Sequence, residues 1–502
     1  MAELTPSDKQ LAIYNVWTST QNCILINSVA GSGKSTTLLK LLEYSDDRTL
    51  FLAFNKSIQV ELEKKIEQKN LLHGKALTMH SLGLTALKEK YSRVFIKSSK
   101  NYGLIKKLRT KEKSTFKGIA WEENSKIGFT MMDLNDASRS FMEDDFHTLL
   151  GILNTMDKNP YIYSTVEGDF TTMMYLWQSF LEIRAESYEG NSIEIDFNDM
   201  IYLPVLQQLD IPVKPAYLFI DECQDLNIAQ HELVNLLLKQ GVKKWVAVGD
   251  RNQAIYGFSG SSSKSFDLFL EKNDHTVELP LDICYRCSGE VIKYANKVYD
   301  VMQQGNPSEG KVETLRDHHA IPQKTLVICR NTKPLIALFF QLLSAERKVY
   351  IKGEDILSSL LRQLNPYRKM TTTLAKRELS EDLEELQVNA TNSKKESDII
   401  KHYMAKEKYK TFLLIYDNLC TGYEKVSELL DKIKELFVED EEAIVLCTIH
   451  KSKGLEADKV CILNENLIPS KFVKSTEQLK QEENLKYVAR TRAISEMYFL
   501  NL

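Results

Sequence analysis

Residues 28–36 read Ser28-Val29-Ala30-Gly31-Ser32-Gly33-Lys34-Ser35-Thr36. An apolar stretch ending at Ile26 precedes them, and a helix-forming stretch begins near Gly33. In a strand–loop–helix unit of this kind, the backbone N–H groups of the loop and of the helix N-terminus bind phosphate groups. We therefore predict a nucleoside triphosphate site. The residues expected to line it are Ala30, Gly31, Ser32, Gly33, Lys34, Ser35 and Thr36.

Two side chains of this loop have specific expected roles. Lys34 should reach the β- and γ-phosphates, and Ser35 should bind Mg²⁺. Ser28 stands where loops of this type usually begin with glycine, so the strict pattern fails at one position. The strand before the loop and the helix after it support the assignment despite this difference.

Acidic residues follow another strongly apolar stretch, Tyr217–Ile220. Because ligands of parallel α/β sheets bind at the carboxyl ends of the strands, we expect Asp221 and Glu222 to point at the nucleotide. Asp221 should hold Mg²⁺ through water, and Glu222 should orient and deprotonate the attacking water. Gln253 lies just past the apolar stretch Trp245–Val248, where we expect it to sense the γ-phosphate.

Strand-like and helix-like segments alternate in two blocks, which predicts an α/β fold with two parallel sheets flanked by helices. Mainly helical stretches interrupt both blocks. The predicted strands are Cys23–Ile26, Leu50–Ala53, Tyr217–Ile220 and Trp245–Val248, then Leu326–Cys329, Ile444–Cys447, Val460–Leu463 and Tyr498–Leu500. The predicted regions are a first domain at 1–92 plus 191–280, its insertion at 93–190, a second domain at 281–356 plus 435–502, and its short insertion at 357–434.

The chain has 502 residues, of which 43% are hydrophobic and 27% charged, as in a typical globular protein. Its net charge is only −4, so any nucleic-acid-binding surface must be local. One basic stretch, residues 93–117, holds nine lysines and arginines against one acidic residue. Charge alone leaves open whether this stretch is simply solvated or contacts phosphates.

Targeting signals are not evident in the sequence. The first residues lack the apolar core of a signal peptide, and the longest apolar stretch, Leu335–Leu343, is too short to span a bilayer. This stretch is expected to form a buried helix. The eight cysteines are scattered, which is typical of reduced thiols. We expect no membrane segment and a cytoplasmic location, near the nucleoid or, for a viral protein, in the host cytoplasm.

Further segments, taken in order with those above, resemble the motifs of UvrD/Rep/PcrA-type superfamily 1 DNA helicases. The resemblance covers nearly the whole chain. The matching segments are 5–10 for the Q motif, 30–36 for motif I, 53–56 and 78–82 for motifs Ia and Ib, 221–225 for motif II, 249–258 for motif III, 285–286 for motif IV, 448–456 for motif V and 482–493 for motif VI.

The resemblance implies two RecA-like domains of the P-loop NTPase fold, with insertions named 1B and 2B, and Mg²⁺-dependent ATP hydrolysis between the two domains. It implies that Gln10 reads adenine, Tyr285 stacks on it and Glu456 contacts the ribose. It also implies that Arg286 and Arg492 are arginine fingers, which stabilise charge on the transferring phosphoryl group.

For nucleic acid, the resemblance implies a helicase that moves on single-stranded DNA with 3′→5′ polarity and unwinds duplex DNA. It also implies binding to junctions of single and double strands by a monomer. Aromatic side chains stack on the bases of single strands. For Phe258, position alone leaves core packing and base stacking equally open. The residues expected to contact DNA are Phe54, Asn55, His80, Tyr256, Phe258, Thr448 and His450.

Three features depart from the family pattern. Phe258-Ser259 stands where the family often has Trp-Arg, Asn55 follows Phe54 directly in a shortened motif Ia, and the insertion at 357–434 is small. Two alternatives stay open: a RecD-like motor of opposite polarity, and an ATP-switched DNA-binding module without processive unwinding. The form Tyr256-Gly257-Phe258 argues against the RecD-like motor. The sequence indicates neither a pathway nor a protein partner.

Overall fold

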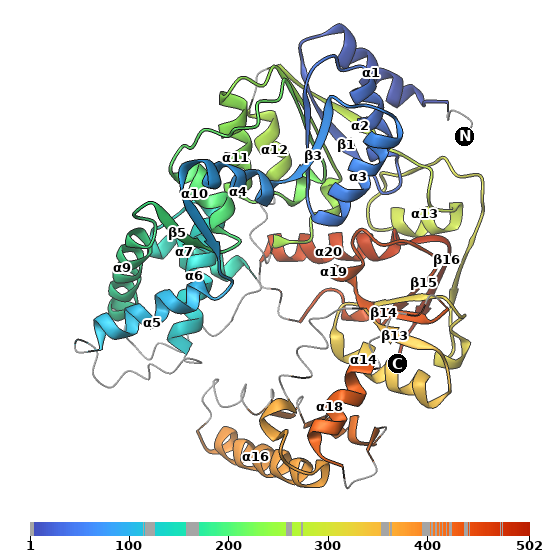
Figure 1. The fold of residues 1–502 in the computed structure, drawn as a ribbon. Helices are drawn as coiled ribbons and strands as arrows, with labels where there is room; N and C mark the ends of the chain where they lie inside the picture. Colours follow the sequence, from blue (N-terminus) through green and yellow to red (C-terminus); the bar gives the residue numbers. More distant parts are fainter. Residues whose placement is uncertain are drawn as a thin grey trace. The chain divides into compact units, whose positions relative to one another are not determined.

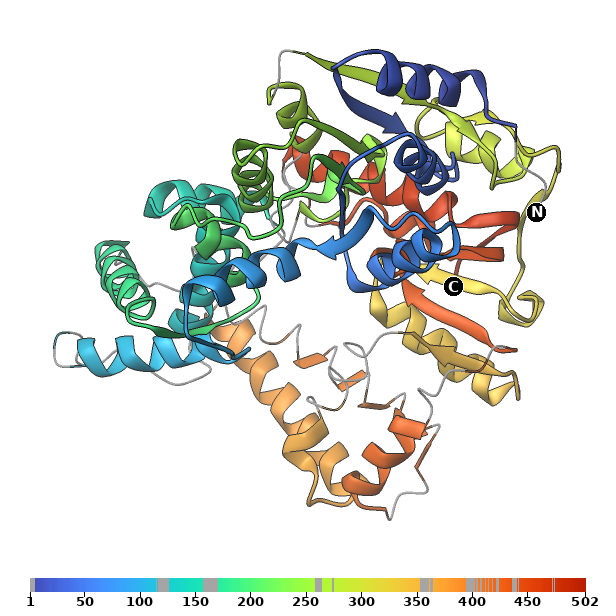
Figure 2. The same ribbon diagram turned by 45° about the horizontal axis from the view of Figure 1, so that its top comes forward.

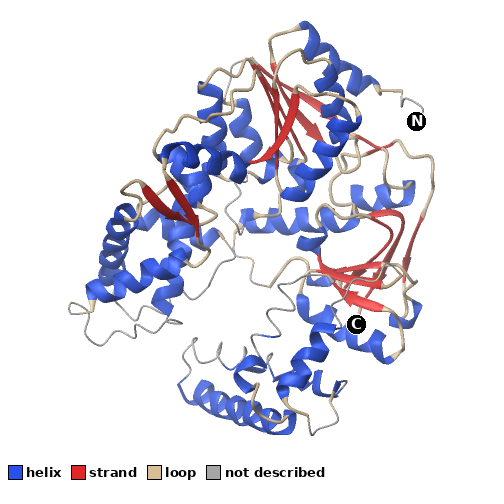
Figure 3. Cartoon of the chain, viewed as in Figure 1, coloured by secondary structure: helices blue, strands red, loops and turns tan. Residues whose placement is uncertain are grey.

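The computed structural model describes residues 5–113, 115, 126–156, 170–257, 264–272, 275–352, 361, 364–393, 402, 405–406, 409–410, 412–413, 415–417, 419–420, 424–435, 440, 442–471, 473 and 475–502. The chain divides into two compact units, the first comprising Met1–Tyr285 with Phe472–Gln481 and the second Arg286–Lys471 with Glu482–Leu502. Each unit contains a six-stranded parallel sheet with helices around it (Figures 1 and 3). The predicted α/β fold with two parallel sheets is therefore confirmed.

The sheet of the first unit has the strand order β3-β2-β6-β7-β1-β8, and every neighbouring pair is parallel. Strands covered on both faces need nearly continuous apolar sequence, which explains why β1, β2, β6 and β7 could be predicted. The strands are β1 (Cys23–Ser28), β2 (Thr49–Ala53), β3 (Gly74–Thr78), β6 (Tyr217–Ile220), β7 (Lys244–Gly249) and β8 (Thr276–Leu281).

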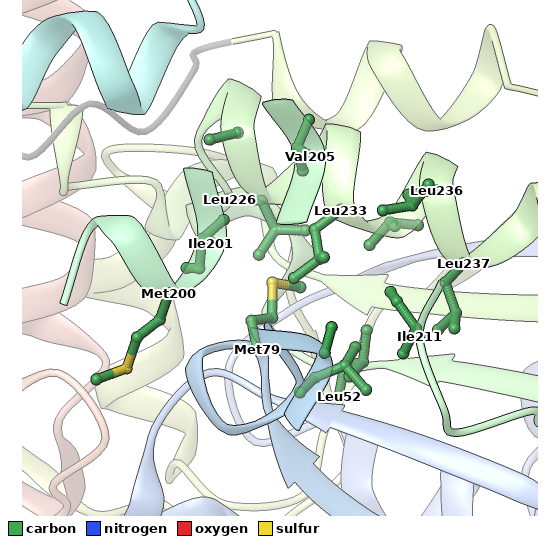
Figure 4. Packing of buried hydrophobic residues seen from close by; sticks show 14 of the residues in the cluster. Leu52, Met79, Met200, Ile201, Val205, Ile211, Leu226, Leu233, Leu236 and Leu237 are labelled. Carbon is green, nitrogen blue, oxygen red and sulfur yellow. The ribbon is translucent and has the colours of Figure 1, made fainter. Parts of the chain in front are cut away.

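Side chains of these strands alternate between two cores, one on each face of the sheet. Ile24 and Ile26 of β1 enter the core that also contains Trp17, whereas Leu25 enters the core that also contains Leu233. Figure 4 shows the second of these cores between the sheet and its helices. The helices are α1 (Asp8–Ser19), α2 (Lys34–Glu43) and α3 (Lys56–Gln68) at the first core, and α4 (Met79–Lys90), α10 (Asp199–Leu206), α11 (Ile228–Lys239) and α12 (Ser265–Leu270) at the second.

A mainly helical region interrupts the first unit between α4 and α10 (Figure 1). It has its own core, in which Trp177 and Phe180 stack with ring centroids 5.7 Å apart. Two short parallel strands, β4 and β5, connect it to the sheet region. Its elements are β4 (Arg93–Ile96), α5 (Lys100–Glu112), α6 (Lys126–Phe141), α7 (Phe146–Thr155), α9 (Phe170–Glu186) and β5 (Ser192–Ile195).

Helices α4 and α10 approach each other unusually closely. A Cβ atom added at Gly83 of α4 would lie 1.8 Å from the carbonyl oxygen of Met200 of α10. Only glycine permits this separation, because the neighbouring group is backbone and cannot rotate away. Gly83 thereby allows the first half of α4 to lie against the start of α10.

The sheet of the second unit has the order β11-β16-β15-β12-β14-β13 and is also parallel throughout. All four strands predicted in this half, β12, β14, β15 and β16, are present. The strands are β11 (Lys311–Thr314), β12 (Leu326–Cys329), β13 (Val349–Ile351), β14 (Ile444–Thr448), β15 (Ala457–Leu463) and β16 (Ala493–Leu500), with helices α13 (Gly289–Asn296), α14 (Thr332–Ser344) and α19 (Ile449–Ser452); α20 (Thr476–Arg490) precedes β16.

The apolar stretch Leu335–Leu343 lies within α14 and packs against the sheet, as predicted for a buried helix. Helices α16 (Thr372–Ser393) and α18 (Val426–Glu435) pack against each other in the inserted region (Figure 2). Among the helices of the described residues, none is both long and apolar enough to cross a membrane.

Candidate nucleotide-binding and nucleic-acid-binding residues

The loop between β1 and α2 has the backbone shape that a phosphate site requires. Gly31 and Gly33 adopt φ angles of 67° and 85°, a left-handed conformation that favours glycine. Ser28 donates a hydrogen bond from its hydroxyl to the carbonyl oxygen of Gly249, at 2.7 Å. The Ser32 hydroxyl is fully buried and has no hydrogen-bond partner within the described residues. A buried polar atom without a partner fits a loop that is completed by a bound ligand.

Lys34, the first residue of α2, forms an ion pair with Glu222, with 2.8 Å between Nζ and Oε1. Burial lowers the pKa of Lys34, but the carboxylates of Glu222, Asp221 and Asp250 outweigh burial, and the net pKa is raised. Asp221 follows β6, so the strand places both acids at its carboxyl end. The structure thus brings together the lysine and the two acids expected at the nucleotide.

The carboxyl groups around Lys34 are costly to ionise. Burial, and then repulsion from Glu222, raises the pKa of Asp221 to about 6. Burial also raises the pKa of Asp250 to about 6, although Lys34 opposes the shift. Excess negative charge in a buried site is relieved when a cation binds.

Glu222 and Gln253 belong to one hydrogen-bond network. Glu222 has a φ angle of 50°, in the left-handed region, and its Oε2 accepts a 2.6 Å hydrogen bond from Gln224 Nε2. Gln224 Oε1 in turn accepts from the N–H of Asp250, whose carboxylate accepts a 2.7 Å bond from Gln253 Nε2. Glu222 and Gln253 are therefore linked through Gln224 and Asp250.

Gln10 and Tyr285 lie beside the loop. Gln10 closes a capping box with Ser7 at the start of α1, and its Nε2 donates a 3.1 Å hydrogen bond to Thr37 of α2. The N–H of Tyr285 donates to the carbonyl oxygen of Gly31 at 2.9 Å, and 45% of Tyr285 is exposed. Both residues therefore contact the loop or the helix that follows it, and their roles toward a base stay predictions.

A magnesium site at this loop would be incomplete without phosphate. Ser35, on the first turn of α2, is half-buried. Within the described residues, no group of three or more histidine, cysteine, aspartate and glutamate side chains could by itself hold a metal ion. Mg²⁺ normally binds one or two carboxylates together with substrate phosphates and water, so Ser35 and Asp221 fit such a site.

The remaining expected nucleotide residues belong to the second unit. Arg286 forms an ion pair with Glu456, 2.6 Å between Nη2 and Oε2. Arg492 is 3% exposed and donates to the carbonyl oxygens of Val488 and Leu455 at 3.0 and 3.2 Å. These contacts fix the guanidinium of Arg492 within its own unit, and the roles of all three expected residues stay predictions.

Four expected DNA residues of the first unit are described by the structure. Phe54 and Tyr256 are half-buried and stacked, with ring centroids 5.8 Å apart and an interplanar angle of 17°. Asn55 caps α3, because its Oδ1 accepts from the N–H of Ile58 at 2.9 Å. Burial lowers the pKa of His80 at the start of α4. Phe258 lies outside the described residues.

Two expected DNA residues lie in the second unit, at the turn after β14. Thr448 caps α19 by accepting a 3.3 Å hydrogen bond from the N–H of Lys451. Burial, and then the charge of Arg330, lowers the pKa of His450 to about 4. Burial therefore favours the neutral imidazole of His450 in the chain without DNA.

Residues 8–274 match a family model described as the UvrD/REP helicase N-terminal domain. The chain belongs to the UvrD/REP helicase family. It is 24% identical over 296 residues to the ATP-dependent DNA helicase Rep of Buchnera aphidicola subsp. Baizongia pistaciae, covering 54% of this chain and 40% of that protein.

Two further relatives differ in how much they align. The Rep helicase of Buchnera aphidicola subsp. Schizaphis graminum is 24% identical over 621 aligned positions, covering 95% of this chain and 90% of the relative. The ATP-dependent DNA helicase PcrA of Staphylococcus epidermidis is 25% identical over 303 residues, covering 56% of this chain and 38% of the relative. The chain thus spans about two fifths of the length of two of these relatives and most of the third.

One exposed aromatic residue was not predicted from the sequence of this UvrD/REP family member. Phe197, between β5 and α10, is 60% exposed, and its ring lies 5.9 Å from that of His80. A single aromatic residue in a short polar turn gives no periodic signal. The signal that could have found it is the acidic and amide residues on either side of it, directly after the alternating strand β5.

The basic stretch 93–117 forms, in part, the amphipathic helix α5. Leu104 and Leu108 enter the core of the inserted region, whereas Lys106, Lys107 and Arg109 are exposed. The apolar face of the helix is therefore covered, and these basic groups form a solvent-facing surface on its other side.

Proposed function

We propose that this chain is an ATP-dependent DNA helicase that moves along single-stranded DNA from 3′ to 5′ and hydrolyses ATP with Mg²⁺. Family membership and relatives named ATP-dependent DNA helicases support this proposal. The observation that carries it is the 2.8 Å ion pair between Lys34 and Glu222 beside a phosphate loop. We further propose a monomer that acts at junctions of single- and double-stranded DNA.

In this proposal, the ion pair is exchanged when ATP enters. The phosphates offer Lys34 more negative charge than one carboxylate does, so Lys34 turns to them. Glu222 then loses its cationic partner and is free to orient a water molecule and to accept its proton. Mg²⁺, held by Ser35 and Asp221, would neutralise the phosphate charge when bound. Gln253, hydrogen-bonded to Asp250, would report the γ-phosphate to the segment that follows β7.

The same unit carries most of the proposed single-strand contacts, and Thr448 and His450 of the second unit are the others. The stacked rings of Phe54 and Tyr256 and the pair His80 and Phe197 supply flat faces, and base stacking on such faces tolerates any sequence. The exposed cations of α5, including Lys106 and Lys107, would contact DNA phosphates. The second unit would supply Arg286 and Arg492 to the phosphoryl group undergoing transfer.

An unwinding assay on duplexes with a 3′ or a 5′ single-stranded tail tests the proposal, with and without ATP. Strand separation only on the 3′-tailed substrate is expected, and Glu222→Gln is the inactive control. Preference for the 5′ tail would indicate the RecD-like alternative. ATP hydrolysis stimulated by single strands, without strand separation on either substrate, would favour a DNA-binding module switched by ATP.

A further inference from the structure

Two buried aspartates, Asp196 and Asp199, hold the short segment that carries Phe197. Asp196 and Asp199 exchange hydrogen bonds, since the N–H of each donates to the carboxylate of the other, at 3.1 and 3.0 Å. Both acids are buried, with 7% and 0% of the residue exposed, while Phe197 between them is 60% exposed. The short turn therefore fixes its backbone and projects one aromatic ring outward.

Cations from the inserted helical region meet these acids. Arg139 of α6 donates from Nη1 to Asp196 at 2.6 Å and to Asp199 at 2.9 Å. Lys100 of α5 pairs with the other oxygen of Asp199 at 2.6 Å. The side chains of Arg139, Lys100 and Asp199 are 1%, 4% and 0% exposed, so the protein shields these charges from bulk water.

A second branch reaches the residue after Phe197. Asp136 of α6 accepts from Arg139 Nη2 at 2.9 Å and from Asn198 Nδ2 at 2.9 Å. The residues on both sides of Phe197 are thus tied to α6. Gly83 leaves room for the close approach of α4 to α10, and His80 of α4 lies beside the Phe197 ring.

Stability alone does not explain an ionic arrangement at this place. Removing two opposite charges from water costs about as much as their attraction returns, so apolar residues of similar volume would hold two elements together as well. A fork of hydrogen bonds, in contrast, specifies direction and distance. The burial of this network matches the need to hold one exposed ring in a fixed orientation.

We propose that Arg139, assisted by Asp136 and Lys100, is a positioning residue through which the inserted helical region sets Phe197 as a rigid stacking face for a DNA base. The inference rests on the proposed function, because it requires that Phe197 meets single-stranded DNA. Arg139 itself is too deeply buried to touch a phosphate. Its effect on DNA must therefore pass through Phe197.

A double-mutant cycle tests this dependence, with the affinity of the full chain for fluorescein-labelled oligothymidylate as the readout. Phe197→Ala is expected to weaken binding about tenfold, as for one lost stacked base. Arg139→Met should weaken binding several-fold in the parent chain. It should have no further effect when residue 197 is already alanine. The slope of affinity against salt concentration should stay unchanged, because no phosphate contact is lost.

Two further variants keep the test decisive. Asp136→Ala removes a partly exposed member of the network and should show the same dependence on Phe197 even if Arg139→Met does not fold. Arg184→Met is the control. Arg184 is 3% exposed and donates to Asp144, Ser138, Asn135 and the Tyr202 hydroxyl, and none of these described hydrogen bonds reaches residues 196–199. It shares Asn135 with Arg139, whose Nε donates to the Asn135 carbonyl oxygen. Arg184→Met should lower thermal stability without changing DNA affinity.

The outcomes separate this inference from the proposed function. Equal losses from Arg139→Met with and without Phe197, or an Arg184→Met effect as large as that of Arg139→Met, would overturn the positioning role. Normal affinity of Phe197→Ala would overturn it too, while leaving helicase activity possible. A parent chain that neither binds oligothymidylate nor hydrolyses ATP would overturn the proposed function as well.

Discussion

Both parallel sheets have a strand-to-helix connection with an ion pair beside it, but the two connections differ in their loops. In the first unit, β1 leads into a loop with two left-handed glycines, and Lys34 pairs with Glu222. In the second unit, β12 leads directly through Arg330 into α14, and Arg330 forms a forked ion pair with Glu482, with distances of 2.7 and 3.0 Å to Oε1.

The two ion pairs differ in the loop that lies beside them. Around Lys34, the Ser32 hydroxyl has no partner among the described residues, and the second oxygen of Glu222 accepts from Gln224. Around Arg330, Glu482 is further occupied by the N–H of Ser470 at 3.1 Å. In the proposed function the first pair is exchanged for a ligand, whereas the second, which has no glycine loop beside it, stays closed. A shared fold thus supplies the position, and loop composition decides whether it becomes a ligand site.

Breaking the exchangeable pair should have the largest effect. We expect both Lys34→Ala and Glu222→Gln to reduce ATP hydrolysis below detection, but by different routes. Lys34→Ala removes charge that compensates the phosphates, so ATP binding should weaken, whereas Glu222→Gln removes the base and should leave binding intact. Steady-state hydrolysis and equilibrium binding of a fluorescent ATP analogue measure the two effects. Near-parental hydrolysis by Glu222→Gln would show that another group is the base.

The second unit is expected to contribute through charge rather than through a phosphate loop. Arg492→Ala should lower kcat about 10³-fold with little change in ATP affinity, because an arginine finger acts mainly in the transition state. Arg492→Lys, which keeps the charge and loses the fork, should recover only part of the rate. An increase in KM at unchanged kcat would instead mean that Arg492 binds ground and transition states equally.

The closed pair should matter for stability. Arg330→Met leaves the Glu482 carboxylate with less compensation at a largely buried site, and we expect a loss of about 3 kcal/mol in the free energy of unfolding. The double variant Arg330→Met with Glu482→Leu should recover much of the lost free energy of unfolding. Lys324→Met is the control, since Lys324 and Glu442 form an exposed pair, 58% each. Denaturant unfolding measures all three, and equal losses at both pairs would contradict the comparison.

The smallest expected effect is a dependence of the melting temperature on pH in the absence of nucleotide. The pKa of Asp221, raised by burial and by Glu222 to about 6 from 3.8, means that the folded chain holds this proton when the unfolded chain has lost it. The contribution of protonated Asp221 to the stability of the fold is therefore fully present below about pH 4 and is lost as the pH rises through about 6. Asp221→Asn should raise the melting temperature by a few degrees at pH 7.5 and progressively less toward pH 5.

A control separates this effect from a general loss of charge. Asp458→Asn changes an exposed residue of β15 and should not alter the melting temperature at either pH. If Asp221→Asn gives the same gain at pH 5 and pH 7.5, the ionised carboxylate is not the source of the instability.

Sequence reasoning succeeded where one local property was enough. The apolar runs Tyr217–Ile220 and Leu326–Cys329 predicted buried strands because nothing else in their sequence competes with that interpretation. Strand β3, which begins at Gly74, and strand β8, which contains Pro280, were missed because both carry residues that disfavour strands. Each lies at an edge of its sheet, where fewer apolar residues are needed.

The motifs of the site could be predicted from the sequence, but the contacts between its side chains could not. The sequence predicts Lys34 and Glu222 at the same nucleotide, and these roles stay predictions; their ion pair was not predicted. The contacts of Arg139 with Asp196 and Asp199 join segments distant in sequence, and no spacing rule signals them. Phe197 was missed for the same reason, since its partner His80 is adjacent only in the folded chain.

The hydroxyl of Ser28 bears on how freely this loop can change during evolution. Ser28 is the last residue of β1 and has no left-handed backbone, so nothing about its conformation demands glycine. Its hydrogen bond to Gly249 offers a serine a positive reason to persist. Gly31 and Gly33, in contrast, have backbones that other residues rarely adopt. The entrance of the loop is therefore constrained by a hydrogen bond, and its tip by backbone conformation.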